Sequence, residues 1–168
     1  MGVVRAARAQ PASLQSEATV AIKGVEIGQV FKFSKTVGET DVTLFAGLTG
    51  DFSDTHINEQ YMQEKSSIGT RIAHGALLVG YMSTASTISI AHVIHRDDLD
   101  EFPVSAGYDR IRFIKPVLLG DTVTVIYKVA EIDEEKRRST AEMEVINQRG
   151  EVVAAGRHLM KWAKKLKN

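Results

Sequence analysis

The chain contains no cysteine among its 168 residues. Disulfide scaffolds, thiolate metal sites and cysteine nucleophiles are therefore excluded. Lys and Arg together number 21, and so do Asp and Glu, so the formal net charge is zero and provides no basic footprint for nucleic acid. The longest stretch without charged side chains, residues 72–94, is interrupted by serines and threonines. That pattern predicts a helix buried in protein rather than one that crosses a membrane.

The composition is that of one globular domain, with 43% hydrophobic and 25% charged residues. The first residues differ, because Arg5 and Arg8 lie among Ala, Gln and Ser and no acidic residue precedes Glu17. We interpret residues 1–23 as a flexible N-terminal extension of a cytoplasmic protein. The alternative is a mitochondrial transit peptide, which has a similar Arg-rich and acid-poor composition.

The middle of the chain predicts helices and one strand. Residues 30–35 alternate as a short strand, and Thr36 followed by Glu39 resembles a capping box at the start of a helix over residues 38–48. Residues 51–70 are polar and predict an excursion of loop and short helix. Apolar residues then recur at helical spacing over residues 75–92, which predicts a long helix enclosed on several sides.

From Pro103 onward the hydrophobic period changes to two, which predicts antiparallel strands. The expected strands cover residues 105–114, 123–129, 141–145 and 152–162, with charged or polar turns at 134–138 and 147–150. A buried helix followed by a meander of strands is an α+β arrangement. We therefore expect one domain over residues 24–163 and a basic tail over 164–168.

The segment most informative about chemistry runs from Phe45 through Gly50 and Asp51 to His56. It resembles the signature of the (R)-specific enoyl-CoA hydratases and MaoC-like dehydratases, in which an aromatic residue, Gly, Asp and His have this spacing. Ser53 stands where that family has Asn, and Asp54 stands where it has Pro. The second change removes a fixed φ angle and adds a carboxylate beside the expected site.

Two further blocks carry the same resemblance, which covers about residues 25–162. Residues 71–78, Arg-Ile-Ala-His-Gly-Ala-Leu-Leu, resemble the family's entry into its central helix, and Ser83 follows at the family's spacing. Residues 112–117, with Gly120 and Asp121, resemble the strand and turn that follow the helix. The resemblance implies a hot-dog fold, an antiparallel sheet wrapped around a long helix, in a homodimer with thioester tunnels at the interface.

The implied reaction is the reversible hydration of a trans-2-enoyl thioester of coenzyme A or acyl carrier protein to the (R)-3-hydroxyacyl thioester. The resemblance makes Asp51 the base toward a water, and His56 the group that positions this water and protonates Cα. The reverse assignment stays open, because both groups act on one water.

The resemblance and the helical pattern also suggest supporting roles. We expect the Gly75 N–H, at the start of the long helix, to face the thioester oxygen. Ser83 is expected to orient Asp51 and Ser53 to hydrogen-bond the loop. His74, Arg112 and Lys115 are expected to contact substrate. Arg71 and Lys128 are further candidates for gripping the phosphates of coenzyme A, or are simply solvated charges.

Two other functions compete with this interpretation. One is an acyl-thioester hydrolase on the same scaffold, and the other is a non-catalytic module that binds acyl thioesters. Hydration by a carboxylate and an imidazole requires no metal or redox cofactor, and we expect none. His92 and His95 lie three residues apart, but no carboxylate has ligand spacing beside them, so they are not expected to bind metal.

Overall fold

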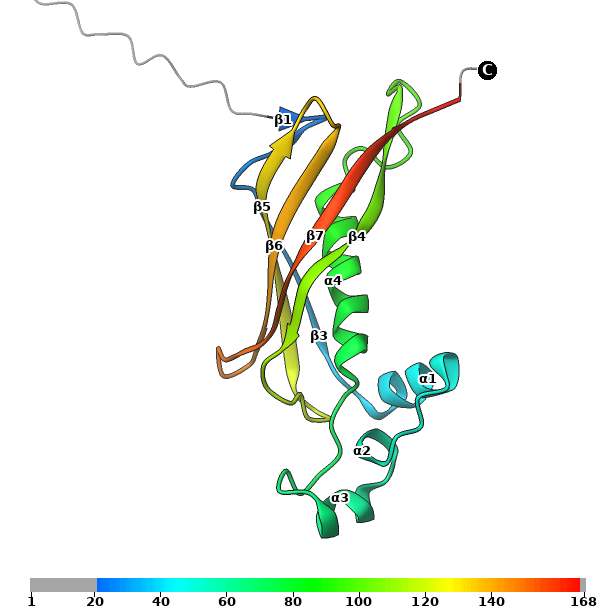
Figure 1. The fold of residues 1–168 in the computed structure, drawn as a ribbon, viewed down its shortest axis with the longest axis vertical. Helices are drawn as coiled ribbons and strands as arrows, with labels where there is room; N and C mark the ends of the chain where they lie inside the picture. The colour runs from blue at the N-terminus through cyan, green and yellow to red at the C-terminus, as the bar shows by residue number, and fades with distance from the viewer. Residues whose placement is uncertain (1–20, 167–168) are drawn as a thin grey trace, which may run out of the picture.

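The computed structural model describes residues 21–166. They form four helices, one two-stranded hairpin and one five-stranded sheet (Figure 1). In chain order the elements are β1 (Ala21–Ile22), β2 (Val25–Glu26), β3 (Val30–Thr36), α1 (Glu39–Thr49), α2 (Asp54–Ile57), α3 (Glu59–Lys65), α4 (Gly75–Ser89), β4 (Glu101–Phe113), β5 (Thr122–Asp133), β6 (Arg138–Asn147) and β7 (Val152–Lys164).

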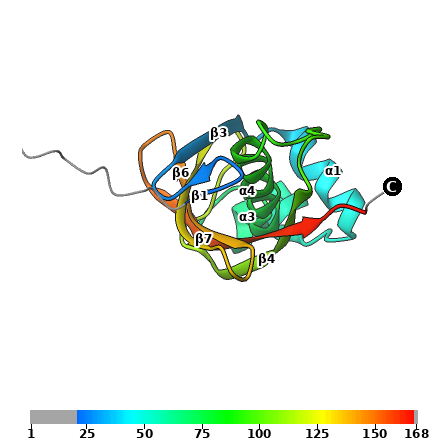
Figure 2. The same ribbon diagram turned by 90° about the horizontal axis from the view of Figure 1, so that it is seen from above.

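The main sheet is antiparallel throughout, with strand order β3-β5-β6-β7-β4. It curves around α4, which packs most extensively against β3 and β5 (Figure 2). The edge strands are β3 and β4. This arrangement confirms the expected hot-dog fold, in which the sheet curves around one long helix and leaves one side of that helix exposed.

The alternating pattern of the sequence explains which face of the sheet is buried. The inward residues of β5 and β6 are Val123, Val125, Tyr127, Val129, Ala141, Met143 and Val145, and all are buried. They meet the apolar side of α4, where Leu77, Leu78, Tyr81, Met82 and Ala85 are buried. Each large apolar side chain removed from water contributes roughly 1.5–3 kcal/mol to folding, so this interface fixes the position of α4.

The start of α1 corrects the predicted capping box. The N-cap is Gly38, and its N–H donates to the Asp41 carboxylate at 2.8 Å. Thr36 lies in β3 and its hydroxyl contacts the Thr122 hydroxyl at 2.7 Å. Glu39 is free to form a different interaction, with Arg71. The helix is therefore capped by Asp41, an acidic residue two positions after the expected Glu39.

The ends of the predicted elements also move. Ordered structure begins before residue 24, because Ile22 lies in β1 and is only 1% exposed. Lys164 is the last residue of β7 rather than part of a tail, and the Lys165 N–H donates to the Asp100 carbonyl. The long helix ends at Ser89, not at residue 92. Residues 1–20 and 167–168, which hold most of the predicted extension and the end of the predicted tail, lie outside the described part of the chain.

Within residues 21–166, none of the helices combines the length and apolar character that crossing a lipid bilayer requires.

Candidate active site

The polar excursion of the sequence forms α1, α2 and α3, which project beyond one end of the sheet next to the beginning of α4 (Figure 1). Arg71 holds these helices together. Its guanidinium donates two hydrogen bonds to Glu39 of α1, at 2.9 and 2.7 Å, and one to Glu59 of α3, at 3.2 Å. The guanidinium hydrogen bonds lower the pKa of Glu39, whereas the pKa of Glu59 is lowered chiefly by the backbone N–H of Arg71, which donates to its carboxylate at 3.1 Å. The structure gives Arg71 a role in joining α1 to α3, while phosphate binding by Arg71 stays an untested alternative.

Asp51 lies just past the end of α1, in an exposed position. Gly50 ends the helix in the left-handed conformation, with φ at 80°, and glycine adopts this conformation without steric cost. The turn brings Asp51 back toward α4. Its N–H donates to the Thr49 hydroxyl at 3.3 Å, and its carboxylate accepts from the Ser53 N–H at 3.4 Å. Ser53 thus supports the Asp51 side chain through its backbone.

His56 lies in α2 and is half-buried. Its Nδ1 lies 2.8 Å from the carbonyl oxygen of Ile72. A carbonyl oxygen only accepts, so we assign the ring proton to Nδ1. The Ile72 N–H in turn donates to the Thr55 carbonyl at 3.1 Å, so α2 and the segment before α4 are joined in both directions. His56 Nε2 is therefore left as the ring atom for chemistry.

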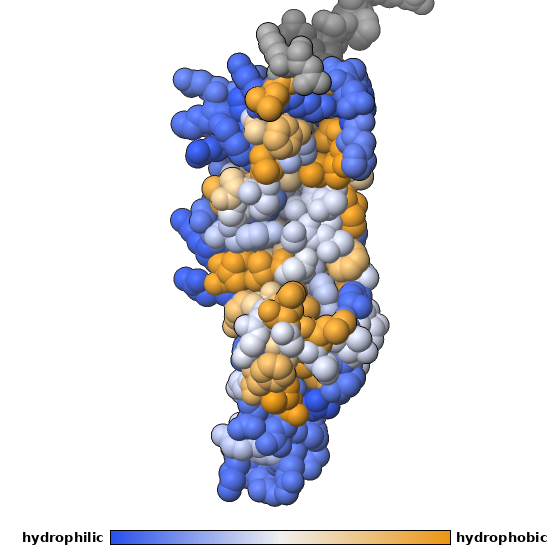
Figure 3. Space-filling view, turned by 90° about the vertical axis from the view of Figure 1, so that its right-hand side faces the viewer, coloured by the Kyte–Doolittle hydropathy of each residue, from blue (hydrophilic) through white to orange (hydrophobic). Residues whose placement is uncertain are grey.

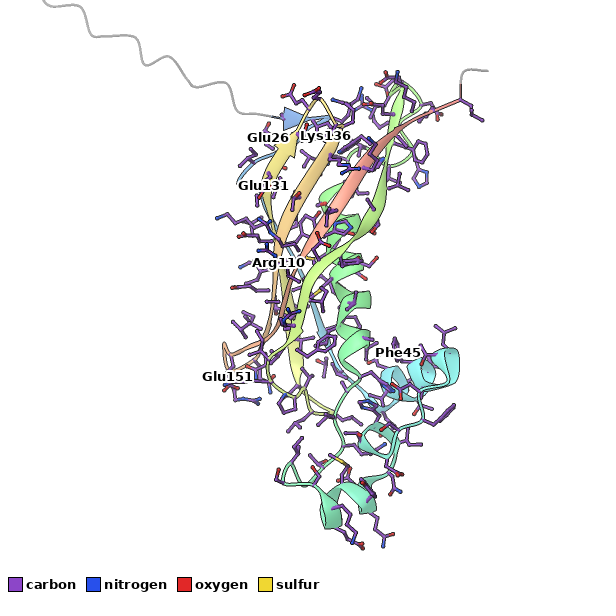
Figure 4. The ribbon with its side chains drawn as sticks, in the orientation of Figure 1. Glu26, Phe45, Arg110, Glu131, Lys136 and Glu151 are labelled. Atoms are coloured by element: carbon purple, nitrogen blue, oxygen red, sulfur yellow. The ribbon has the colours of Figure 1, made fainter. Side chains whose placement is uncertain are left out.

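His74 is the N-cap of α4, and it is 1% exposed. Its Nε2 lies 3.0 Å from the backbone oxygen of Asp51. Its ring stacks on that of His56 with centroids 3.8 Å apart and planes 29° apart, and Phe45 packs on it at 4.8 Å. Phe45 reaches this stack from α1, across from the beginning of α4 (Figure 4). Three rings from three different helices therefore meet at one point.

Asp51, His56 and His74 each offer a polar atom within 4.8 Å of the others. A carboxylate and two imidazoles are metal-ligand types, and these three form the one such group among residues 21–166. The geometry does not suit an ion, however. Lone pairs of imidazole lie in the ring plane, and two rings stacked nearly parallel direct them side by side rather than to a common point. The cluster fits proton transfer better than metal binding.

Gly75 begins α4 next to this cluster, so its N–H is one of the first-turn donors that have no partner within the helix. The segment before it is tied to the turn after β4: the Ala73 N–H donates to the Val117 carbonyl, and Ile72 pairs with Leu118. Asp121 braces that turn by accepting from the Leu118 N–H at 3.0 Å.

The open Cα face of Gly75 is filled by Phe113, because a Cβ at Gly75 would lie 2.6 Å from that ring. The missing side chain therefore leaves no room for a substrate on this face, because the ring of Phe113 occupies the space. Gly75 is required here for the close approach of Phe113.

A cavity of about 350 Å³ lies between the beginning of α4 and the end of β4. Its polar side chains are His56 and Lys115. Its apolar lining includes Ile68, Ile72, Leu78, Phe113, Ile114 and Val117. The catalytic candidate His56 therefore borders an apolar space of a size suited to a small acyl group.

The structure does not bring every predicted residue to this site. Ser83 lies about 12 Å along α4 from Gly75, on the exposed side of the helix, and its hydroxyl makes no hydrogen bond to Asp51. Lys128 lies in β5 opposite Glu142 of β6. Arg112 is exposed and donates to the Ile111 carbonyl, and Lys115 pairs with Glu151 at 2.6 Å. Of the four cationic candidates, Arg71, Arg112, Lys115 and Lys128, only Lys115 lines the cavity.

Sequence reasoning missed Phe113 and the aromatic packing of Phe45 on His74. Phe113 belongs to a quoted motif, but no periodicity indicated that its ring would reach Gly75. Sequence spacing alone gave no signal for either contact, because the residues are 38 and 29 positions apart and meet only in the folded chain. His92, for which the sequence suggested no metal role, contacts the Lys23 carbonyl at 3.2 Å.

Comparison with known proteins agrees with this geometry. Residues 23–152 match the family model described as MaoC like domain. The chain belongs to the MaoC-like family. The resemblance predicted from the three sequence blocks is confirmed, together with the hydro-lyase class of enzyme that it implied.

Three relatives illustrate the family. The (R)-specific enoyl-CoA hydratase of Rhodospirillum rubrum is 33% identical over 67% of this chain and 72% of its own length. The 3-hydroxybutyryl-CoA dehydratase of Methylorubrum extorquens is 32% identical over 84% of this chain and 83% of its own. The solved (R)-hydratase from A. caviae matches 83% of this chain and 98% of its own, with 25% identity and a TM-score of 0.71.

Proposed function

We propose that this protein reversibly hydrates a trans-2-enoyl thioester of coenzyme A or acyl carrier protein to the (R)-3-hydroxyacyl thioester. One observation carries the proposal: Asp51 and His56 offer polar atoms within 4.8 Å of each other, and His56 borders an apolar cavity beside the first turn of α4. The reaction needs a proton acceptor, a proton donor and a polarised thioester carbonyl. The names of the relatives agree with this choice.

In the proposed mechanism Asp51 and His56 share one water. The water oxygen bonds to Cβ as Asp51 takes its proton, while the N–H at Nε2 of the protonated His56 ring gives a proton to Cα. The C=C bond becomes a C–C bond, one proton is gained at Asp51 and one is lost from His56. Proton exchange with solvent then restores both groups. Dehydration uses the same steps in reverse.

The first turn of α4 supplies the third requirement. As Cβ is attacked, negative charge develops on the thioester oxygen. The Gly75 N–H, with the positive end of the helix dipole behind it, stabilises an oxygen placed there. We propose that the carbonyl approaches along the N–H direction, because the Cα face of Gly75 is covered by Phe113.

We propose separate binding places for the acyl group of the substrate and for the phosphates of its carrier. The acyl group enters the apolar cavity between α4 and β4. Lys115 lines the cavity and offers a cation to the phosphates of the carrier, and Arg112, outside the lining but next to Phe113 in the chain, is a second candidate. Lys115 must then exchange its Glu151 partner for phosphate, which makes its contribution small and dependent on salt.

We also propose that two copies associate through β4 and α4. The outer edge of β4 is unpaired in the sheet and exposes Phe102, Val104 and Phe113. The exposed positions of α4 form one stripe of mostly small residues: Ala76, Gly80, Ser83, Thr84, Thr87 and Ile88. This side of the molecule shows pale and orange residues along its centre with blue mainly at its margins (Figure 3). A second copy would protect the strand edge and cover the stripe.

The deciding experiment uses purified protein and crotonyl-CoA. Loss of the enoyl absorbance without release of thiol is the expected result, and the product should be oxidised by an (R)-specific but not an (S)-specific 3-hydroxyacyl-CoA dehydrogenase. Thiol release would make the protein an acyl-thioester hydrolase instead. An unchanged absorbance with crotonyl, hexenoyl and octenoyl thioesters, on both carriers, would contradict the proposal.

A further inference from the structure

We propose that His74 is a positioning residue that holds both members of the catalytic pair and must stay neutral to do so. The inference rests on the proposed function of Asp51 and His56. It replaces the expectation that His74 contacts substrate, because His74 is 1% exposed and does not line the cavity.

His74 touches the catalytic pair in two separate ways. Through Nε2 it contacts the backbone oxygen of Asp51 at 3.0 Å, so it fixes the turn from which the carboxylate projects. Through its ring face it stacks on His56 at 3.8 Å, so it limits the rotation of the ring whose Nε2 would deliver the proton. One side chain therefore sets the position of Asp51 relative to His56.

His74 is itself held firmly. Phe45 packs against it at 4.8 Å, and its backbone oxygen accepts from the Leu77 N–H in the first turn of α4. The ring is consequently anchored to the same helix terminus that presents the Gly75 N–H. The N-terminus of α4 thus fixes the positions of the Asp51 carboxylate, the His56 imidazole and the Gly75 N–H relative to one another. A preorganised site requires this kind of rigid support.

The protonation of His74 follows from its contacts. The Asp51 oxygen only accepts, so Nε2 carries a proton. The other ring nitrogen, Nδ1, is buried and has no hydrogen-bond partner among the described residues. Protonating Nδ1 would bury a positive charge and an N–H without an acceptor, which costs much free energy. Burying the unprotonated nitrogen without a donor costs less. A cation would also lie face to face with the ring of His56. We infer the neutral ring with its proton on Nε2.

Two variants separate the two contacts. His74→Phe keeps a ring between Phe45 and His56 but has no donor for the Asp51 carbonyl. His74→Gln can still donate to that carbonyl but cannot stack. We expect each to lower kcat on crotonyl-CoA by about 10- to 100-fold with KM changed less than about threefold, since misplaced catalytic groups slow the chemical step. Tyr81→Phe is the matched control and should keep wild-type kcat. It removes a buried hydroxyl of α4 that, like His74 Nδ1, has no hydrogen-bond partner within residues 21–166.

A purely structural role would give a different result. In that case both His74 variants would lose thermal stability while the folded fraction turned over at the wild-type rate, and the proposal would be wrong. Retention of wild-type kcat by only one variant would overturn the corresponding half, either the carbonyl contact or the ring stack.

A second measurement does not depend on activity. Ring ¹⁵N chemical shifts of the wild-type protein should identify His74 as the neutral Nε2–H form, and the His56 ring signals should move in His74→Phe. A protonated or Nδ1–H form of His74 would overturn the inference. If these spectra are as expected but no enoyl thioester is hydrated, the proposed function fails while the contacts of His74 stand.

Discussion

Phe113 lies so close to Gly75 that a Cβ added to the glycine would be 2.6 Å from its ring. The two residues come from the end of β4 and the beginning of α4, and both line the cavity beside His56. The glycine at the helix N-terminus therefore has a packing role besides the proposed N–H contact with substrate.

Gly75→Ala should separate these two roles. The alanine keeps the N–H, but its methyl group must displace Phe113, and we expect kcat/KM to fall about tenfold or more because the cavity mouth is rearranged. The double variant Gly75→Ala/Phe113→Ala removes the clash and should recover the rate of Phe113→Ala alone. Gly47→Ala, at an exposed helical glycine with no atom near its Cβ position, is the control and should be neutral. A double variant as slow as Gly75→Ala would show that the methyl group blocks substrate directly.

The catalytic pair gives the second prediction. Asp51→Asn and His56→Gln should each lower turnover of the enoyl thioester by about 100-fold or more, since each removes one proton transfer. Both proteins should keep the circular dichroism spectrum and melting temperature of the wild type within a few degrees. The matched control is Asp54→Asn, because Asp54 is an exposed carboxylate three residues away whose partner is Asn58. An equal loss of turnover in Asp51→Asn and Asp54→Asn would contradict the assignment of Asp51 as a catalytic residue.

A second histidine, His158 of β7, is fully buried, and we expect it to dominate the change of stability between pH 7 and pH 5. Its Nε2 lies 2.9 Å from the Ser105 hydroxyl and its Nδ1 lies 3.0 Å from the Tyr127 hydroxyl. Burial lowers the pKa of His158 from 6.5 to about 4. The unfolded chain therefore binds a proton between these values that the folded chain does not.

Stability should consequently be fully present above about pH 6.5 and fall as the pH decreases toward 4. A single group of this kind contributes about 2 kcal/mol to the difference in unfolding free energy between pH 7 and pH 5, which urea titrations at the two values can measure. His158→Gln should flatten this dependence, whereas His95→Gln, at an exposed histidine, should not. A pH dependence that is unchanged by His158→Gln would contradict the assignment.

The proposed association of two copies can be tested on α4. Gly80 lies in the middle of the exposed stripe, and no atom lies within 4 Å of its Cβ position. Gly80→Arg should therefore leave the fold of one chain intact but obstruct a second copy. Light scattering should report a dimer for the wild type and a monomer for this variant. Gln60→Arg, at an exposed position of α3, is the control and should stay dimeric. A monomeric wild-type protein would refute the proposed interface.

The sequence alone predicted the fold class and the order of the elements from residue 30 onward, and it suggested the pairing of Asp51 with His56 that we propose. It did not indicate the β1–β2 hairpin. Hydrophobic period distinguishes a buried helix from half-buried strands, so the inward faces of β5 and β6 could be named residue by residue. The spacing from Phe45 to His56 carried the family resemblance, because residues close in sequence keep their local geometry.

The tertiary structure decided the contacts between residues that are far apart in the sequence. The pairing of Arg71 with Glu39 and Glu59, the contact of Phe113 with Gly75 and the burial of His74 all join residues from different elements. The residue type alone does not say whether each of these side chains is exposed to solvent, binds a ligand or packs in the core. The choice depends on how α1, α3 and β4 meet the beginning of α4, and this is set by the packing of the whole domain rather than by any local pattern.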